Sequence, residues 1–298
     1  MSILNFKIIS LIAPLVLVAC TTTGGKYHKS IDIESLLKSS EVSEVNKELL
    51  SASSVKKAEN DLENGRVKSS LKYANLALQF DPNSLTAKTI AGKAEIANQN
   101  YQIGTQYFSE IIKVNPSSEN FQFLGIGLYF TGRTDEAVFA LTSAHTGDAT
   151  LWRASVLLAR IKNNQGEIEN ADALFSTALS YAKMPEVVYE HMGQAYAERE
   201  AWPQAVIAFK MAQSLSDNQI GRHDEYWFSL AKTNQLNTVL TQAKSNDIAR
   251  LYRTLGKESL DTGDAIDAIE NFKKAQSHFS RYDKMTDQLM KRALNLLS

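Results

Sequence analysis

Four kinds of position recur along the chain at intervals of 33 or 34 residues, and this recurrence limits the possible folds most strongly. In the stretch from Glu186 to Asp217, Gly193 is followed by Ala205, Phe209 and Ala212. Residues three and four apart share one face of a helix, so this stretch predicts two antiparallel helices with a break between them. The four positions recur as Ala58, Gly92, Gly125, Ala159 and, after a longer interval, Gly256; as Ser70, Gly104, Ala137, Ala171 and Ala268; as Ala74, Phe108, Leu141, Phe175 and Phe272; and as Ala77, Ile111, Ala144, Ala178 and Ala275.

This spacing resembles the tetratricopeptide repeat, a helix–turn–helix unit of 34 residues. A small residue lets two helix backbones approach, and a large residue of the second helix fills the space beside it. Two further features agree with the resemblance: Asp81-Pro82 and Asn115-Pro116 stand 34 residues apart, and glycines occur at the expected turns, namely Gly65, Gly132, Gly166 and Gly263. The resemblance implies an all-α fold, a right-handed superhelical solenoid of helical hairpins that ends in a capping helix.

The predicted array spans residues 54–280 and holds about six to seven repeats. Within it, residues 217–247 keep helical apolar spacing but lose the small residues, so we interpret them as a degenerate repeat. Residues 31–53 do not match the repeat and are predicted to form a helical lead-in. In residues 281–298, Met285, Leu289, Ala293 and Leu296 share one face. This pattern predicts a capping helix, which a solenoid needs to cover the apolar surface of its last repeat.

The first 19 residues have the features of a signal peptide. Lys7 precedes an apolar run over residues 8–19, which is too short to span a bilayer as a helix. The run ends in Leu17-Val18-Ala19-Cys20, which resembles the lipobox of bacterial lipoproteins. The resemblance implies that the chain is cut before Cys20, whose sulfur and new amine then carry acyl chains such as palmitate. The alternative is an ordinary signal peptide that happens to contain a cysteine.

The residues after Cys20 indicate a tether and a location. Residues 20–30 are small, polar and glycine-bearing, which is typical of a flexible segment between lipid and fold. In lipoproteins, aspartate directly after the lipidated cysteine favours retention in the inner membrane, and here the residue is Thr21. The resemblance therefore implies the outer membrane of a Gram-negative bacterium, with the protein facing the periplasm.

Nothing in the sequence indicates catalysis. Cys20 is the only cysteine, which excludes an internal disulfide and a thiolate metal site. Without the signal segment the chain has 31 basic and 33 acidic residues, so it lacks the positive excess of a nucleic-acid binder. We predict no enzymatic activity, cofactor, metal site, nucleic-acid partner or small-molecule substrate. The histidines are scattered, with none four residues from another: His28, His145, His191, His223 and His278.

The candidate binding surface follows from the resemblance. In a tetratricopeptide superhelix the first helix of each pair lines the concave groove, where a partner docks. Tyr129 and Phe130 attract most interest, because two adjacent aromatic residues cannot both lie in one helix stripe. The alternative is that one belongs to the core and the other packs on a neighbouring repeat. The residues predicted to face the groove are Lys93, Ile96, Tyr129, Phe130, Arg160, Asn163, Asn164, Gln194, Glu198 and Lys257.

A lipoprotein signal followed by a chain-long repeat array resembles the TadD-type lipoprotein of tight-adherence (Flp) pilus loci. This resemblance implies a non-enzymatic scaffold that binds a secretin or a pilus component and assists assembly of a pilus or secretion machine. Two alternatives remain in the same class: a type IV pilotin-like protein, and an adaptor for a periplasmic peptidase or a cell-wall enzyme. An enzymatic or solute-binding lipoprotein is disfavoured, because the sequence shows no polar cluster and no alternation of strand and helix patterns.

Overall fold

The structure is a computed structural model that describes residues 44–216 and 224–297. All the regular secondary structure in these two ranges is helical, which confirms the predicted all-α class. The signal segment, Cys20, the tether and residues 31–43 of the lead-in lie outside the described residues. The helices are α2 Glu44–Glu63, α3 Val67–Phe80, α4 Leu85–Ala97, α5 Tyr101–Val114, α6 Ser118–Phe130, α7 Thr134–Gly147, α8 Trp152–Asn164, α9 Ile168–Tyr181, α10 Pro185–Glu198, α11 Trp202–Leu215, α12 Asp224–Lys232, α13 Leu236–Gln242, α14 Ser245–Asp261, α15 Ala265–His278 and α16 Lys284–Asn295.

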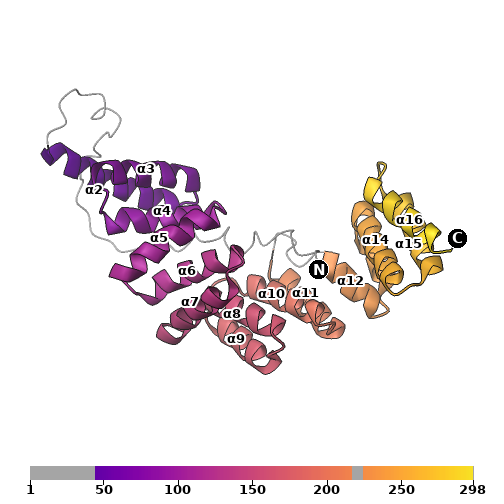
Figure 1. The fold of residues 1–298 in the computed structure, drawn as a ribbon. Helices are drawn as coiled ribbons and strands as arrows, with labels where there is room; N and C mark the ends of the chain where they lie inside the picture. The colour runs from indigo at the N-terminus through magenta and orange to yellow at the C-terminus, as the bar shows by residue number, and fades with distance from the viewer. Residues whose placement is uncertain (1–43, 217–223, 298) are drawn as a thin grey trace. The chain divides into compact units, whose positions relative to one another are not determined.

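The chain divides into two compact units, with the boundary between Ala182 and Lys183. Unit 1 contains α2 to α9, and unit 2 contains α10 to α16 (Figure 1). In unit 1 the hairpins α2–α3, α4–α5, α6–α7 and α8–α9 follow one another. In unit 2 the hairpins α10–α11, α12–α13 and α14–α15 precede α16.

The predicted pairing of a small and a large residue is present in the four hairpins that carry a glycine at the first position, α4–α5, α6–α7, α10–α11 and α14–α15. A Cβ atom on Gly92 of α4 would lie 2.9 Å from Cε2 of Phe108, a fully buried residue of α5. In unit 2, a Cβ on Gly193 would lie 2.7 Å from Cδ1 of Phe209. Real Cβ atoms do not approach other carbons this closely, so the absence of a side chain is what lets the two helices meet. The predicted packing register is therefore confirmed.

The turns within the hairpins share one backbone geometry. In the first, the amide of Gly65 donates to the carbonyl of Leu62 (3.0 Å) and the amide of Arg66 to that of Asp61 (2.8 Å). This pair of bonds ends a helix through a residue with positive φ. Gly65, like the other predicted turn glycines, has such a φ (72–87°). Seven hairpins of the described residues close in this way, and in three of them the position is held by Gln99, Glu200 and Asn234.

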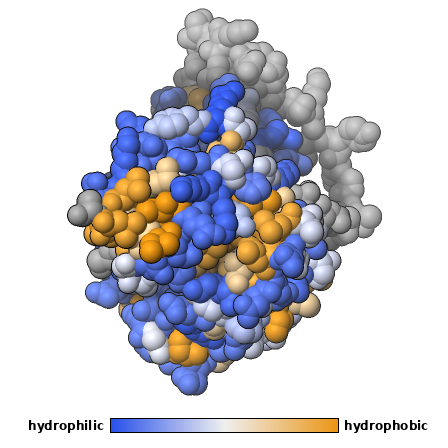
Figure 2. Space-filling view, turned by 90° about the vertical axis from the view of Figure 1, so that its right-hand side faces the viewer, coloured by the Kyte–Doolittle hydropathy of each residue, from blue (hydrophilic) through white to orange (hydrophobic). Residues whose placement is uncertain are grey.

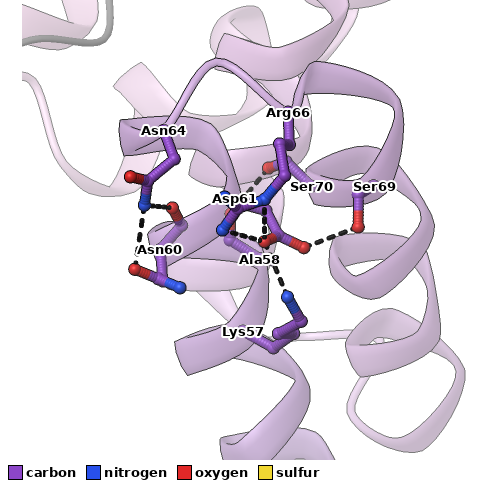
Figure 3. A network of polar contacts seen from close by, with 8 residues as sticks. All are labelled: Lys57, Ala58, Asn60, Asp61, Asn64, Arg66, Ser69 and Ser70. Carbon is purple, nitrogen blue, oxygen red and sulfur yellow. Dashed lines mark hydrogen bonds and ion pairs between the residues drawn. The ribbon is translucent and has the colours of Figure 1, made fainter.

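A buried carboxylate cross-links the first hairpin (Figure 3). The side chain of Asp61 has no exposed surface, and it accepts hydrogen bonds from Lys57 Nζ at 2.7 Å, Arg66 Nε at 2.8 Å and Ser69 Oγ at 2.6 Å. Beside it, Ser70 Oγ donates to the carbonyl of Ala58 at 2.7 Å. These contacts join α2, the turn and α3 into one unit.

The first repeat begins earlier than the sequence pattern predicts. Helix α2 runs without a break from Glu44, so residues 44–53 belong to the first hairpin rather than to a separate lead-in. Leu50 is buried, and Ser51 Oγ lies 3.4 Å from the carbonyl of Ala77 in α3. The small residues that mark the repeat lie only in the second half of this helix, so the pattern could not place its start.

The stretch interpreted as a degenerate repeat forms the two shortest helices of unit 2. Helix α12 has nine residues and α13 has seven. Trp227, Leu230 and Val239 nevertheless join the core built by Phe209 of α11. At the end of the unit, α16 packs on α15 and α14 and buries Leu289 and Ala293, as expected for a capping helix. Met285 and Leu296, predicted on the same face, are 54% and 62% exposed.

Candidate partner-binding face

Consecutive first helices pack against one another, and this forms the face on which a partner was expected. In unit 1, α2 packs on α4, α4 on α6 and α6 on α8, whereas the second helices of the described hairpins make no comparable contact with each other. The first helices are therefore the more closely spaced layer. We call the surface that they share the first-helix face; α10, α12, α14 and α16 form the corresponding face of unit 2.

Lys93 lies on this face of unit 1 and is held by two neighbours. Its Nζ pairs with Glu119 of α6 at 2.7 Å and lies 5.1 Å from the centre of the Phe123 ring. Phe123 in turn stacks on Phe108, with ring centres 5.2 Å apart. The ion pair thus ties two repeats together and fixes a charged group above an apolar floor.

Three aromatic side chains form a cluster where the C-terminal end of α6, with Tyr129 and Phe130, meets the start of α5, a second helix that begins at Tyr101. Phe130 stacks on Tyr101 of the preceding hairpin, with ring centres 4.4 Å apart and planes 20° apart. Tyr129 meets Phe130 edge-on at 5.2 Å. All three side chains are half-buried, and burial raises the pKa of Tyr101 to about 12. Phe130 therefore packs on a neighbouring repeat, as the alternative interpretation had it, while each ring of the cluster keeps some accessible surface.

Several predicted groove residues are core residues instead. Ile96 has no exposed surface, and its Cδ1 lies 2.6 Å from where a Cβ on Gly104 would stand. Its side chain fills the space that this glycine leaves, so the prediction that Ile96 faces a partner is wrong. Arg160 and Asn163 of α8 are 3% and 6% exposed, so they do not form a solvated patch. Asn164 is exposed, and its Oδ1 lies 3.4 Å from Nδ2 of Asn163.

The remaining predicted residues belong to unit 2. Gln194 and Glu198 lie on α10, where the first is half-buried and the second exposed, and Lys257 is half-buried on α14. The structure therefore distributes the ten predicted residues over two units rather than gathering them into one site.

Ion pairs also join the first helices of unit 2. Arg250 of α14 pairs with Asp224 of α12 at 2.9 Å, and Lys232 of α12 pairs with Glu258 of α14 at 2.6 Å. The next pair along the unit joins Arg253 to Asp283, the N-cap of α16, at 3.0 Å.

The sequence did not identify Glu119, Phe123 or Tyr101 as residues of the site. For Glu119, however, the sequence contains a pattern that could have predicted its contact with Lys93. The two residues of the Lys93–Glu119 pair are 26 positions apart, as are those of the pairs Asp224–Arg250 and Lys232–Glu258. Opposite charges at this separation face each other on adjacent first helices. The aromatic contacts had no such signal, because aromatic residues also occur throughout the core.

The described residues contain no group of three or more histidine, cysteine, aspartate or glutamate side chains that could hold a metal ion. No helix in the described ranges is both long and apolar enough to cross a bilayer. The described residues present a fixed ion pair at the N-terminal end of α6 and partly accessible aromatic rings at its C-terminal end, an arrangement suited to holding another polypeptide.

No protein-family model and no curated protein matches the sequence. The fold resembles that of solved structures. A tetratricopeptide repeat protein from Parabacteroides merdae has a TM-score of 0.55 at 15% identity, covering 83% of this chain and 100% of the other. TTC0263, such a protein from Thermus thermophilus, has a TM-score of 0.51 at 13% identity, over 61% of this chain and 99% of its own. The pilF protein of Pseudomonas aeruginosa has a TM-score of 0.50 at 12% identity, over 82% and 98%.

At these identities the likenesses show the fold. The consecutive helix pairs, the 34-residue register and the likeness to solved tetratricopeptide proteins agree, so the chain has the tetratricopeptide-repeat fold.

Proposed function

We propose that this protein is a non-enzymatic scaffold of the bacterial envelope that binds another protein on the first-helix face of unit 1. The cluster of Tyr101, Tyr129 and Phe130 carries this proposal. Rigid aromatic rings supply contact area at a low cost in side-chain entropy, and for this reason aromatic residues dominate the energetic centres of protein interfaces. The ion pair of Lys93 and Glu119, towards the other end of α6, adds a polar feature that a partner can recognise.

The location in the outer membrane is part of the proposal and rests on residues 1–21 of the sequence. A lipidated Cys20 would hold the array beside the membrane through the tether of residues 20–30. The partner would then be a component of an envelope machine, namely the secretin or a pilus component of a Tad/Flp-type system. The alternatives are a type IV pilotin-like role and an adaptor role for a periplasmic peptidase or a cell-wall enzyme.

An affinity purification tests the binding face. The tagged wild type and the double variant Tyr129→Ala/Phe130→Ala are purified from detergent-solubilised envelopes of the native bacterium, and the captured proteins are identified by mass spectrometry. Phe139→Ala is the matched control, because Phe139 is an aromatic residue that is 66% exposed on α7, a second helix. We expect the double variant to lose a partner that the wild type and the control retain.

The identity of the partner separates the possible roles. Capture of a secretin or pilus component supports assembly of a pilus, and capture of a peptidase or murein enzyme favours the adaptor. If the double variant keeps every partner while remaining folded, the proposed face is wrong. Cys20→Ala tests the anchor separately: we expect it to abolish incorporation of radiolabelled palmitate and to release the protein from the membrane fraction.

A further inference from the structure

The outer surface of α2 carries a row of carboxylates. Glu48, Lys56, Glu59 and Glu63 follow one another at helical spacing on the side of α2 that faces away from the buried residue Ala58, and all four are exposed. Glu48, Glu59 and Glu63 take part in none of the ion pairs of the described residues. With Lys56 as the only cation, this row has two excess negative charges at the start of unit 1.

The end of unit 2 carries the opposite charge. On α16, Lys284 and Lys291 lie on the side that faces away from the buried residue Leu289, and Arg292 lies between that side and the buried one; all three are exposed. Lys291 pairs with Asp287, the only acidic residue of α16, at 2.9 Å. Lys284 and Arg292 take part in none of the ion pairs in the described ranges, so this surface has two excess positive charges.

Apolar side chains lie beside both rows. Met285 and Leu296 flank the cations of α16 and are 54% and 62% exposed, and Leu49 flanks the carboxylates of α2 and is 45% exposed. Figure 2, which views the protein from the side where α14 to α16 lie in Figure 1, shows separate hydrophobic patches within a mostly hydrophilic surface. Each end thus combines uncompensated charge with accessible apolar area.

We propose that α16 of one molecule docks on α2 of a second copy of this chain, in a head-to-tail contact. Among the described helices, α2 packs on α3 and α4, and α16 packs on α14 and α15, so each has described neighbours on one side only. The two surfaces differ, so the contact is heterologous: a row of molecules keeps a free α2 at one end and a free α16 at the other, and further copies can add there. Charge complementarity favours contact between α16 and α2 over contact between two copies of the same helix, because like charges brought together across an interface repel. The proposal does not depend on the partner-binding face of unit 1.

Two charge-reversed variants test this contact in the full chain, purified in a density-matched detergent. The tail variant is Lys284→Glu/Arg292→Glu, and the head variant is Glu59→Lys/Glu63→Lys. Sedimentation velocity follows self-association up to concentrations on the order of 100 μM. The control is Lys113→Glu/Lys210→Glu, which makes the same change of charge as the tail variant, but at exposed positions of α5 and α11.

We expect the wild type and the control to self-associate at low salt and to dissociate as salt rises, because the screening length falls from about 10 Å at 0.1 M to about 3 Å at 1 M. Each reversed variant alone should associate at least about tenfold more weakly, since its two ends then carry like charge. An equimolar mixture of the two variants should recover association, because the negative tail of one now meets the positive head of the other.

Three results would overturn the proposal: a wild type that stays monomeric at low salt, association that survives both reversals, and a mixture that fails to recover it. Binding of the monomeric wild type, but not the tail variant, to vesicles of anionic phospholipid would instead assign α16 to a membrane surface. Unchanged melting temperatures establish that each variant is folded. A variant that no longer self-associates but still captures its envelope partners would show that this contact is independent of the proposed function.

Discussion

Asp61 couples the stability of the first hairpin to pH. Burial alone would raise the pKa of its carboxyl, but the hydrogen bonds from Lys57, Ser69 and Arg66 outweigh burial and lower it to about 2. A carboxyl with a depressed folded pKa stabilises the fold above its unfolded pKa, and this contribution is lost as pH falls towards the folded value. For a shift of this size the contribution is about 2 kcal/mol.

Asp61→Asn should therefore destabilise the protein by about 2 kcal/mol at neutral pH, because the amide keeps the shape but loses the charge. The difference from wild type should stay constant above about pH 5 and shrink progressively below pH 4. Urea unfolding of both proteins between pH 3 and 7 measures it. A deficit that does not change with pH would mean that the ionised carboxylate is not what stabilises the hairpin. Asp135→Asn is the matched control, since Asp135 is exposed on α7.

At this scale the sequence predicted the residues of the candidate site only in part. Lys93, Tyr129 and Phe130 lie on or beside the first-helix face with accessible surface. Ile96 does not, although it holds a helix position equivalent to that of Tyr129. Gly104 of α5 has no side chain, so Ile96 of α4 can point inwards and fill that space. A pattern read along one helix cannot predict this contact, because it depends on a residue of the next helix.

At the scale of the element, the hairpin is the unit that the sequence specifies best. Its small and large residues, four positions apart on the second helix, both report on the same interface, so six stretches could be aligned without a structure. The start of α2 and the non-glycine turns were beyond prediction. Gln99, Glu200 and Asn234 adopt positive φ because the packing of the helices on either side of the turn imposes it, although glycine tolerates that region best.

Ala205→Arg tests the packing of the α10–α11 hairpin. Ala205 has no exposed surface and lies in one core cluster with Phe209 and Trp227. We expect the variant to lose at least about 1–3 kcal/mol from overpacking, plus the cost of burying a charge. Ile207→Arg is the control on the same helix, because Ile207 is 64% exposed and should change stability by less than about 0.5 kcal/mol. Thermal melts measure both, and equal melting temperatures would contradict the helix register.

At the scale of the molecule, stability is distributed unevenly along the array. Each hairpin contacts mainly its neighbours, so the stability of a repeat protein is approximately a sum of local terms. Helix α13 buries only Val239, whereas α14 buries six residues over its 17 positions. From the missing small residues, the repeat pattern predicted a degenerate repeat over residues 217–247. It gave no indication of the boundary at Ala182, since the register continues across it.

Hydrogen exchange should show this difference directly. We expect the amides of α12 and α13 to exchange faster than those of α14 and α15, because short helices with few buried side chains open at low free-energy cost. Mass spectrometry of peptides from the labelled native protein measures the rates. If the amides of residues 224–278 were all equally protected, these helices would open together, and the number of side chains that each helix buries would not determine its exchange rate.

The turn that closes every hairpin has a mechanical consequence. Its two backbone bonds and the packing beside it lie between residues close in sequence, so a force applied to the chain ends loads the hairpins in series. Each can yield without unlocking the others and would release a length on the order of 100 Å, the reach of about 34 extended residues. A protein of this construction lengthens in steps under tension and recoils hairpin by hairpin when the load is removed.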